Sequence, residues 1–196
     1  MHWGSDIGAA WLARELARLS GGAAGLATVS RLVTDVNRDP KDPTTFLYDT
    51  GEGRVRFNRG ISETEQKRRL EAYFHPFHRG VDADVHTLRP RFVLSVHSFT
   101  PEYRGEKRDV EVGVLFDQYD DLAMAWVAAL RQEGFRAEPN EPYSGKKGLI
   151  YSPARHGNDN GLPYLELEVR QDLIATRPLA KAVAARIFRA MGVAGV

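Results

Sequence analysis

The feature that most restricts the fold of this chain is an alternation of short apolar runs with longer amphipathic segments. Residues 91–98 and 110–116 are near-continuous apolar runs, which are typical of strands covered on both faces. Residues 27–34 are rich in β-branched side chains, and residues 165–169 alternate apolar side chains with glutamates. Both of these stretches therefore also predict strands.

Segments with helical spacing of their apolar residues separate these runs. We expect helices over about residues 8–19, 62–85, 120–134 and 178–191. The second helix begins with a capping box formed by Ser62 and Glu65, and Pro76 should kink or interrupt it. Residues 41–60 carry Pro, Gly, Asp and Asn, and predict a long loop.

Alternating helices and buried strands predict an α/β sandwich with a mostly parallel central sheet. The length of 196 residues suggests a single domain over residues 1–196. In sheets of this kind, ligands bind in the crevice outside the carboxyl ends of the strands. The polar residues that end each apolar run are therefore the first candidates for a functional site.

Composition excludes several classes of protein. Lysine and arginine number 27 against 26 acidic residues, so we expect no nucleic-acid partner. The absence of cysteine excludes disulfides and thiolate metal sites, which leaves His, Asp and Glu as metal ligands. No apolar run is long enough to cross a membrane and residues 1–6 do not resemble a signal peptide. We therefore expect a cytoplasmic protein with no membrane partner, and the sequence sets no oligomeric state.

His97 ends the apolar run at 91–98, and strand alternation places it on the same face as Ser95. An imidazole in this position can be a metal ligand, a general base or a hydrogen-bonded core residue. The sequence alone leaves these three readings open.

Glu166, Glu168 and Arg170 share one face of the strand expected at 165–169. One interpretation is an edge strand with a solvated face and an ion pair. The other is a carboxylate held at the mouth of the sheet as a base, with a guanidinium beside it that is suited to a substrate carboxylate.

Arg31 and Arg38 flank Asp35 and Asn37 at the end of the first predicted strand. A solvated strand end with an Asx-type turn explains this pattern. Arg31, however, lies within the apolar part of the segment, so it should be partly buried and should have an anionic partner.

Several segments together carry a family resemblance, and it extends over nearly the whole chain. They are HWGSDIGA (2–9), SRLVTDVNR (30–38), YFHPFH (73–78), SVHSFTP (95–101), NEPYSG (140–145) and EVRQDLI (168–174). In this order they resemble the N-formylglutamate amidohydrolase family, whose early Trp-Asp-x-Gly-Ala segment is similar to residues 2–9 with Ser5 in place of Trp.

The resemblance implies a zinc-carboxypeptidase-like fold, which is a three-layer α/β/α sandwich, and a catalytic zinc ion. It implies hydrolysis of the N-formyl or N-acyl amide of an acidic amino acid such as N-formylglutamate. It assigns His97 and Asp6 as zinc ligands and Glu168 as the general base. It assigns the binding of substrate carboxylates to four residues: Arg31, Asn37, Arg38 and Arg170.

One departure from the family pattern concerns the metal. Members of the family begin with a strand whose histidine-bearing turn supplies the first zinc ligand, and no such turn precedes Asp6. His2 could substitute with a different geometry. We therefore expect either a shortened sequence or a family member with an incomplete site, and the second case favours a protein that binds acidic amino-acid derivatives without turnover.

Overall fold

The computed structural model describes residues 4–195, which fold into two compact units. Of the described residues, one unit comprises 4–5 and 25–89, and the other comprises 6–24 and 90–195. The prediction of one domain over the chain stays a prediction. None of the helices in the described part of the chain has the length and apolar character that a membrane span requires.

The unit of residues 6–24 and 90–195 contains a four-stranded mixed sheet in the order β1-β6-β4-β5. Its strands are β1 (Val93–Phe99), β4 (Val112–Leu115), β5 (Ala137–Pro139) and β6 (Tyr164–Arg170). The pairs β1–β6 and β4–β5 are parallel, whereas β4 and β6 are antiparallel. The predicted mixed α/β class is confirmed, and the strand at 165–169 is interior rather than at an edge.

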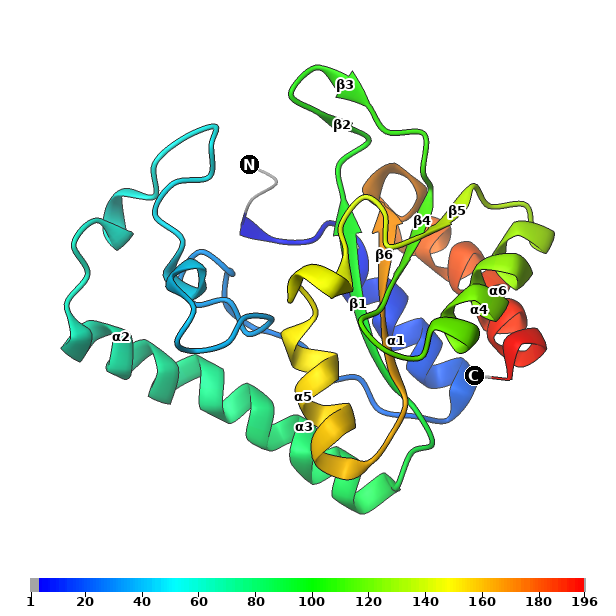
Figure 1. Cartoon of the computed structure of the whole chain (residues 1–196), viewed down its shortest axis with the longest axis horizontal. Coiled ribbons are helices and arrows are strands. Elements are labelled where there is room, and N and C mark those ends of the chain that lie inside the picture. Colours follow the sequence, from blue (N-terminus) through cyan, green and yellow to red (C-terminus); the bar gives the residue numbers. More distant parts are fainter. Residues whose placement is uncertain (1–3, 196) are drawn as a thin grey trace. The chain divides into compact units, whose positions relative to one another are not determined.

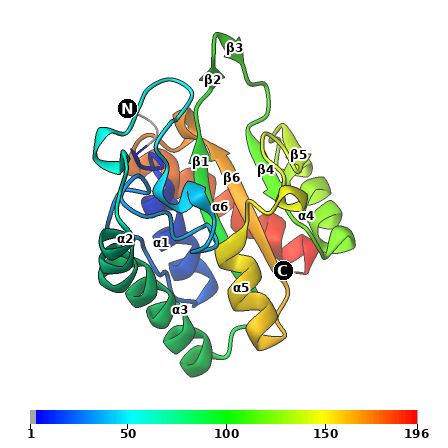
Figure 2. The same cartoon turned by 60° about the vertical axis from the view of Figure 1, so that its left-hand side comes forward.

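Helices cover both faces of this sheet (Figure 1 and Figure 2). They are α1 (Ala9–Ser20), α4 (Asp120–Gln132), α5 (Tyr151–Asn160) and α6 (Arg177–Ala194), with short 3-10 turns η5 (Gly145–Lys147) and η6 (Gln171–Leu173). On one face, Leu165, Leu167 and Val169 of β6 join a core with α1, α4 and α6. On the other face, Tyr164 and Leu115 pack with Ile150 at the start of α5. This unit is therefore a three-layer arrangement with the sheet in the middle.

A short antiparallel hairpin follows β1. It consists of β2 (Glu102–Tyr103) and β3 (Glu106–Lys107), and Arg104 and Gly105 form its turn with positive φ angles. The backbone N–H of Arg108 donates to the carbonyl of Pro101 at 2.9 Å, which closes the base of the hairpin. Both ends of the hairpin are thus fixed beside the carboxyl end of β1.

The unit of residues 25–89 contains helices and loops. Its regular elements are η2 (Pro43–Phe46), η3 (Arg56–Asn58), α2 (Glu63–Arg69), the π turn η4 (Leu70–Phe74) and α3 (His75–Leu88). The side chain of Ser62 accepts the N–H of Glu65 at 3.2 Å, so the predicted N-terminal cap is confirmed. The π turn directly precedes Pro76, and its wider hydrogen-bonding ring accommodates a residue that cannot donate an N–H.

Three local predictions were wrong. Residues 27–34 form turns rather than a strand, because a strand needs a neighbour for its backbone groups and the Ser30 carbonyl instead accepts the N–H of Val33. Residues 151–160, for which no helix was predicted, form α5, and His156 on this helix is buried. In addition, β1 is an edge strand with mostly half-buried residues, not a strand fully covered on both faces.

Candidate functional site

A row of polar side chains lies on one face of the sheet, where β1 and β6 run side by side. Ser95 pairs with Glu166 and His97 pairs with Glu168 in the parallel register. Residues paired across adjacent strands point to the same face, so the imidazole and both carboxylates share one surface. Glu166 is 2% exposed and Glu168 is 7% exposed. The structure therefore brings together His97 and Glu168, which are far apart in the sequence.

His97 is held at both ring nitrogens. Its Nδ1 lies 2.7 Å from the Asp6 carboxylate, and its Nε2 lies 2.8 Å from the Ser95 hydroxyl. The Glu166 carboxylate is 3.5 Å from the same Nε2. These contacts fix the orientation of the ring, and they place two predicted site residues, Asp6 and His97, in direct contact.

The backbone that follows Asp6 explains its position. Gly8 adopts a positive φ of 82° at the start of α1, and a Cβ there would overlap the carbonyl of Ile174. Only glycine fits this conformation and this close approach without strain. The Asp6-Ile7-Gly8 segment therefore packs closely against the connection that joins β6 to α6, and Asp6 is held against His97.

The surrounding carboxylates control the charge of the imidazole. Burial lowers the pKa of His97, but the Glu166, Asp6 and Glu168 carboxylates together outweigh burial and raise it to about 10. The metal-free site therefore holds an imidazolium at neutral pH. A metal ion requires the neutral ring, so binding of a metal by His97 would release a proton.

A loop passes over the same face of the sheet beside Glu168. Gly113 of β4 pairs with Glu168, and a Cβ on Gly113 would overlap the carbonyl of Glu141. The side chain of Asn140 fixes this loop by accepting the N–H groups of Phe116 at 3.1 Å and Gly145 at 2.9 Å. The NEPYSG segment thus forms one wall of the polar row.

The donor atoms fit part of a zinc site. Imidazole and carboxylate are ligands that zinc accepts, and a catalytic zinc site takes three protein ligands. Asp6 and His97 supply two, and within residues 4–195 no group of three or more His, Asp or Glu side chains is placed to hold a metal ion. His2 lies outside the described residues. A zinc ion at this position would therefore need a further ligand from outside them.

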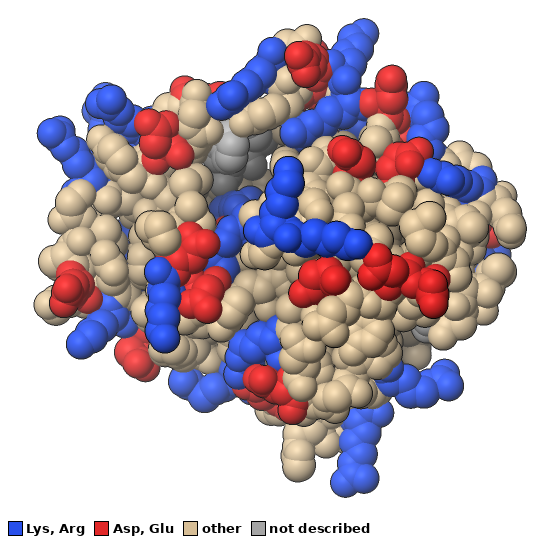
Figure 3. All heavy atoms as spheres, in the orientation of Figure 1, with Lys and Arg blue, Asp and Glu red and all other residues tan. Residues whose placement is uncertain are grey.

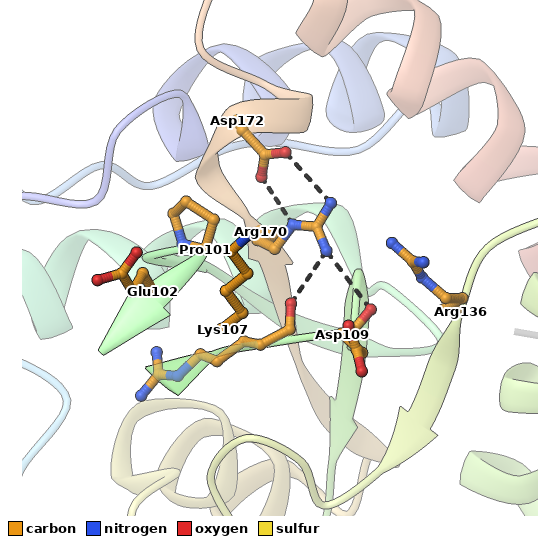
Figure 4. A pocket seen from close by; sticks show the side chains of 8 residues that line it. Pro101, Glu102, Lys107, Asp109, Arg136, Arg170 and Asp172 are labelled. Atoms are coloured by element: carbon orange, nitrogen blue, oxygen red, sulfur yellow. Dashed lines mark hydrogen bonds and ion pairs between the residues drawn. The ribbon is translucent and has the colours of Figure 1, made fainter. Parts of the chain in front are cut away.

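The guanidinium of Arg170 is hydrogen-bonded to other residues of its own unit. Its Nε donates to Asp172 at 2.8 Å, and its Nη1 donates to the Arg108 carbonyl at 3.1 Å. It lines an open cavity of about 410 Å³ together with Lys107, Arg136 and other charged residues, and Figure 4 shows its guanidinium facing Asp172. A substrate carboxylate would have to displace Asp172 from the fork.

The other predicted binding residues lie in the unit of residues 25–89. Arg31 forms an ion pair with Asp35 at 2.7 Å, so the expected anionic partner is present. Asp35 also accepts the N–H of Asn37 at 2.9 Å in the expected Asx-type turn, and Arg38 donates to the Asn37 carbonyl at 2.8 Å. Their role toward a substrate stays a prediction.

Sequence reasoning gave no role to Ser95 and Glu166, and both contact His97. The signal that identifies them is the period of two, since each stands two residues before His97 or Glu168 on the same strand face. The alternative of a solvated edge face for Glu166 and Glu168 is wrong, because β6 lies between β1 and β4 and both side chains are buried.

Comparisons with known proteins place this arrangement in context. Residues 1–175 match the family model described as N-formylglutamate amidohydrolase. A gene product, Atu2144 from Agrobacterium tumefaciens, superposes with a TM-score of 0.89 at 30% identity, covering 99% of this chain and 79% of that one. The N-formylglutamate amidohydrolase from Ralstonia eutropha JMP134 superposes with a TM-score of 0.64 at 20% identity, covering 96% of this chain and 83% of that one. No curated protein matches the sequence.

Proposed function

Because the chain belongs to the N-formylglutamate amidohydrolase family, we propose that it hydrolyses the N-formyl or another N-acyl amide of an acidic amino acid. N-formylglutamate is the model substrate, and its products are formate and glutamate. The observation that carries the proposal is the pairing of His97 with Glu168 on one sheet face, with Asp6 in contact with the imidazole.

Glu168 is the general base in this proposal. Its buried carboxylate lies in the same row as His97, where it accepts a proton from the attacking water and later gives it to the leaving amine. The water oxygen forms the new bond to the acyl carbon, and the C–N bond breaks. Glu166 and Ser95 hold the His97 ring at Nε2, while Nδ1 faces Asp6.

We further propose that Asp6 and His97 hold a zinc ion with a ligand from outside residues 4–195. Zinc in this place supplies Lewis acidity, which lowers the pKa of a bound water to about 7. The two donors seen in contact support this proposal. They equally allow an incomplete site that binds acidic amino-acid derivatives without turnover, so the two possibilities need a direct test.

The test measures formate release from N-formylglutamate by the wild type and by the Glu168→Gln variant. We expect turnover to fall by about 10²- to 10⁴-fold, because the substitution removes the base without changing its shape. Glu138→Gln is the matched control, since Glu138 is half exposed on β5 and pairs with Arg131. Full turnover by Glu168→Gln would refute the role of the base.

Elemental analysis of the same preparations tests the metal. We expect zinc in the wild type and in Glu168→Gln, and less zinc in Asp6→Asn. A wild type that binds N-formylglutamate but contains no zinc after metal addition and releases no formate would establish the non-catalytic alternative.

A further inference from the structure

The guanidinium of Arg108 is held by three aromatic rings, a carbonyl and a hydroxyl. Its Cζ lies 4.8 Å from the ring centre of Tyr103, 5.4 Å from that of Tyr143 and 5.6 Å from that of Phe99. Three aromatic faces therefore surround one cation. The guanidinium also contacts the Thr100 carbonyl and the Tyr143 hydroxyl, each at 3.4 Å.

The charge of Arg108 is not neutralised by an acid within the part of the chain that the structure describes. Arg170 is bound by Asp172, Arg136 by Glu111 and Arg131 by Glu138. The contacts of the Arg108 guanidinium are aromatic rings, a carbonyl and a phenol. These neighbours fix its position while leaving its positive charge available to an anion.

Two separate features place this cation at the rim of the polar row. Phe99 follows His97 by two residues on β1, so it lies on the same sheet face, about 6.6 Å further along the strand. Tyr143 belongs to the loop whose Glu141 carbonyl lies over Gly113, and Gly113 pairs with Glu168. One ring comes from the His97 strand and one from the wall beside Glu168, and Arg108 contacts both.

We infer that Arg108 is a specificity-determining residue that binds the side-chain carboxylate of the substrate. This inference rests on the proposed function. The α-carboxylate carbon of an N-acyl amino acid is two bonds from the amide nitrogen, whereas the side-chain carboxylate of glutamate reaches further. Arg108 contacts Phe99, the residue two strand positions beyond His97, so its cation matches the more distant group.

The experiment compares two ligands of equal length, N-formylglutamate and N-formylglutamine, in which a neutral amide replaces the side-chain carboxylate. Binding is measured by calorimetry in the Glu168→Gln background, so that turnover does not enter. We expect N-formylglutamate to bind roughly 10- to 100-fold more tightly, as a hydrogen bond to a charged group provides. Adding Arg108→Met should remove this preference and leave the affinity for N-formylglutamine unchanged.

Arg104→Met is the matched control, because Arg104 belongs to the same hairpin and lies 5.2 Å from the Tyr103 ring but makes no contact with Phe99 or Tyr143 among the described interactions. It should retain the preference for N-formylglutamate.

Arg108→Lys keeps the charge without the planar fork, so it should retain part of the preference for N-formylglutamate. This variant detects the contribution of the charge even if Arg108→Met disturbs the hairpin.

The inference would be overturned if Arg108→Met still bound N-formylglutamate more tightly than N-formylglutamine. It would also be overturned if the Glu168→Gln protein with Arg108 intact bound both ligands equally. Loss of affinity for both ligands would indicate an α-carboxylate contact and would overturn it as well. If the wild type releases no formate but the tighter binding of N-formylglutamate still depends on Arg108, the role of Arg108 is upheld. The proposed hydrolysis is then refuted.

Discussion

Buried polar side chains serve different purposes in the two compact units. In residues 25–89 they bind the backbone: Asn58 donates to the carbonyls of Leu32 at 2.7 Å and Leu47 at 2.8 Å, and Arg69 donates to the Val33 carbonyl at 3.1 Å. In the sheet unit, the buried Glu166 instead contacts the partly buried His97 on a frame of apolar strands. The first kind stabilises loops, and the second concentrates ionisable groups at one place on the sheet, which is typical of a functional site.

The largest expected effect in this comparison comes from Arg69→Met. Arg69 is 7% exposed and also donates to the Asn58 side chain at 2.6 Å, so its removal leaves several buried acceptors without a donor. We expect a loss of about 3–5 kcal/mol in the free energy of unfolding, measured by urea denaturation. Arg68→Met is the control, because Arg68 is exposed and shares the Glu65 partner, and it should change stability by less than about 1 kcal/mol. Equal effects of the two variants would show that the polar network does not stabilise this unit.

The corresponding change in the sheet unit is Leu167→Ala. Leu167 is completely buried between the β6 backbone and the helices of the larger core. Removal of its side chain should cost about 2–5 kcal/mol through lost burial and the cavity left behind. Leu179→Ala, at a half-exposed leucine of α6, should have a much smaller effect in the same denaturation experiment. A loss below 1 kcal/mol for Leu167→Ala would contradict an apolar basis for this unit.

An effect that is smaller per pH unit than either substitution should follow from a change of pH. The folded-state pKa of His97, about 10, lies above its ordinary value of 6.5, so its contribution to stability is complete below about pH 6.5 and is lost as pH rises through 10. In metal-free protein, the melting temperature of the wild type should therefore fall between pH 7 and 10 more steeply than that of His97→Gln. One proton contributes at most about 1.4 kcal/mol per pH unit to this slope. Parallel curves for the two proteins would show that the carboxylates do not stabilise the imidazolium.

The local pattern of apolar residues was sufficient to predict an element wherever that segment buries one regular face. The alternation at 165–169 correctly identified β6 and the shared face of its two glutamates, and the spacing at 178–191 identified α6. Ser62 was recognised because an N-cap depends on residues three apart in the sequence. These features are encoded by near neighbours.

Predictions failed where distant contacts decide the structure. Residues 151–160 contain Pro153, Gly157 and several polar residues, so their helical propensity is low, yet they form α5. Gly157 packs directly on the ring of Tyr164, where a Cβ would overlap, and this contact with β6 compensates for weak propensity. The β-branched residues at 27–34 lack the neighbouring strand that their propensity presupposes.

The same limit applies to the site. The face shared by Ser95 and His97 followed from local alternation, but the contact of His97 with Asp6 depends on the position of α1. The enclosure of Arg108 by three rings depends on a loop that crosses to the sheet from residue 140 onward. Neither arrangement has a signal within one segment of sequence.

The π turn at Leu70–Phe74 sets the direction in which the side chains of α3 point, so a deletion within the turn would change that direction. The turn contains one residue more than a regular helical turn, and α3 continues from it with His78 buried and its Nε2 3.1 Å from the Val36 carbonyl. Loss of a single residue from this turn would rotate every later side chain of α3 by about 100° around the helix axis. His78 would move away from the Val36 carbonyl and an exposed neighbour would take its place. A chain that keeps this contact therefore needs a constant number of residues between Ser62 and His78.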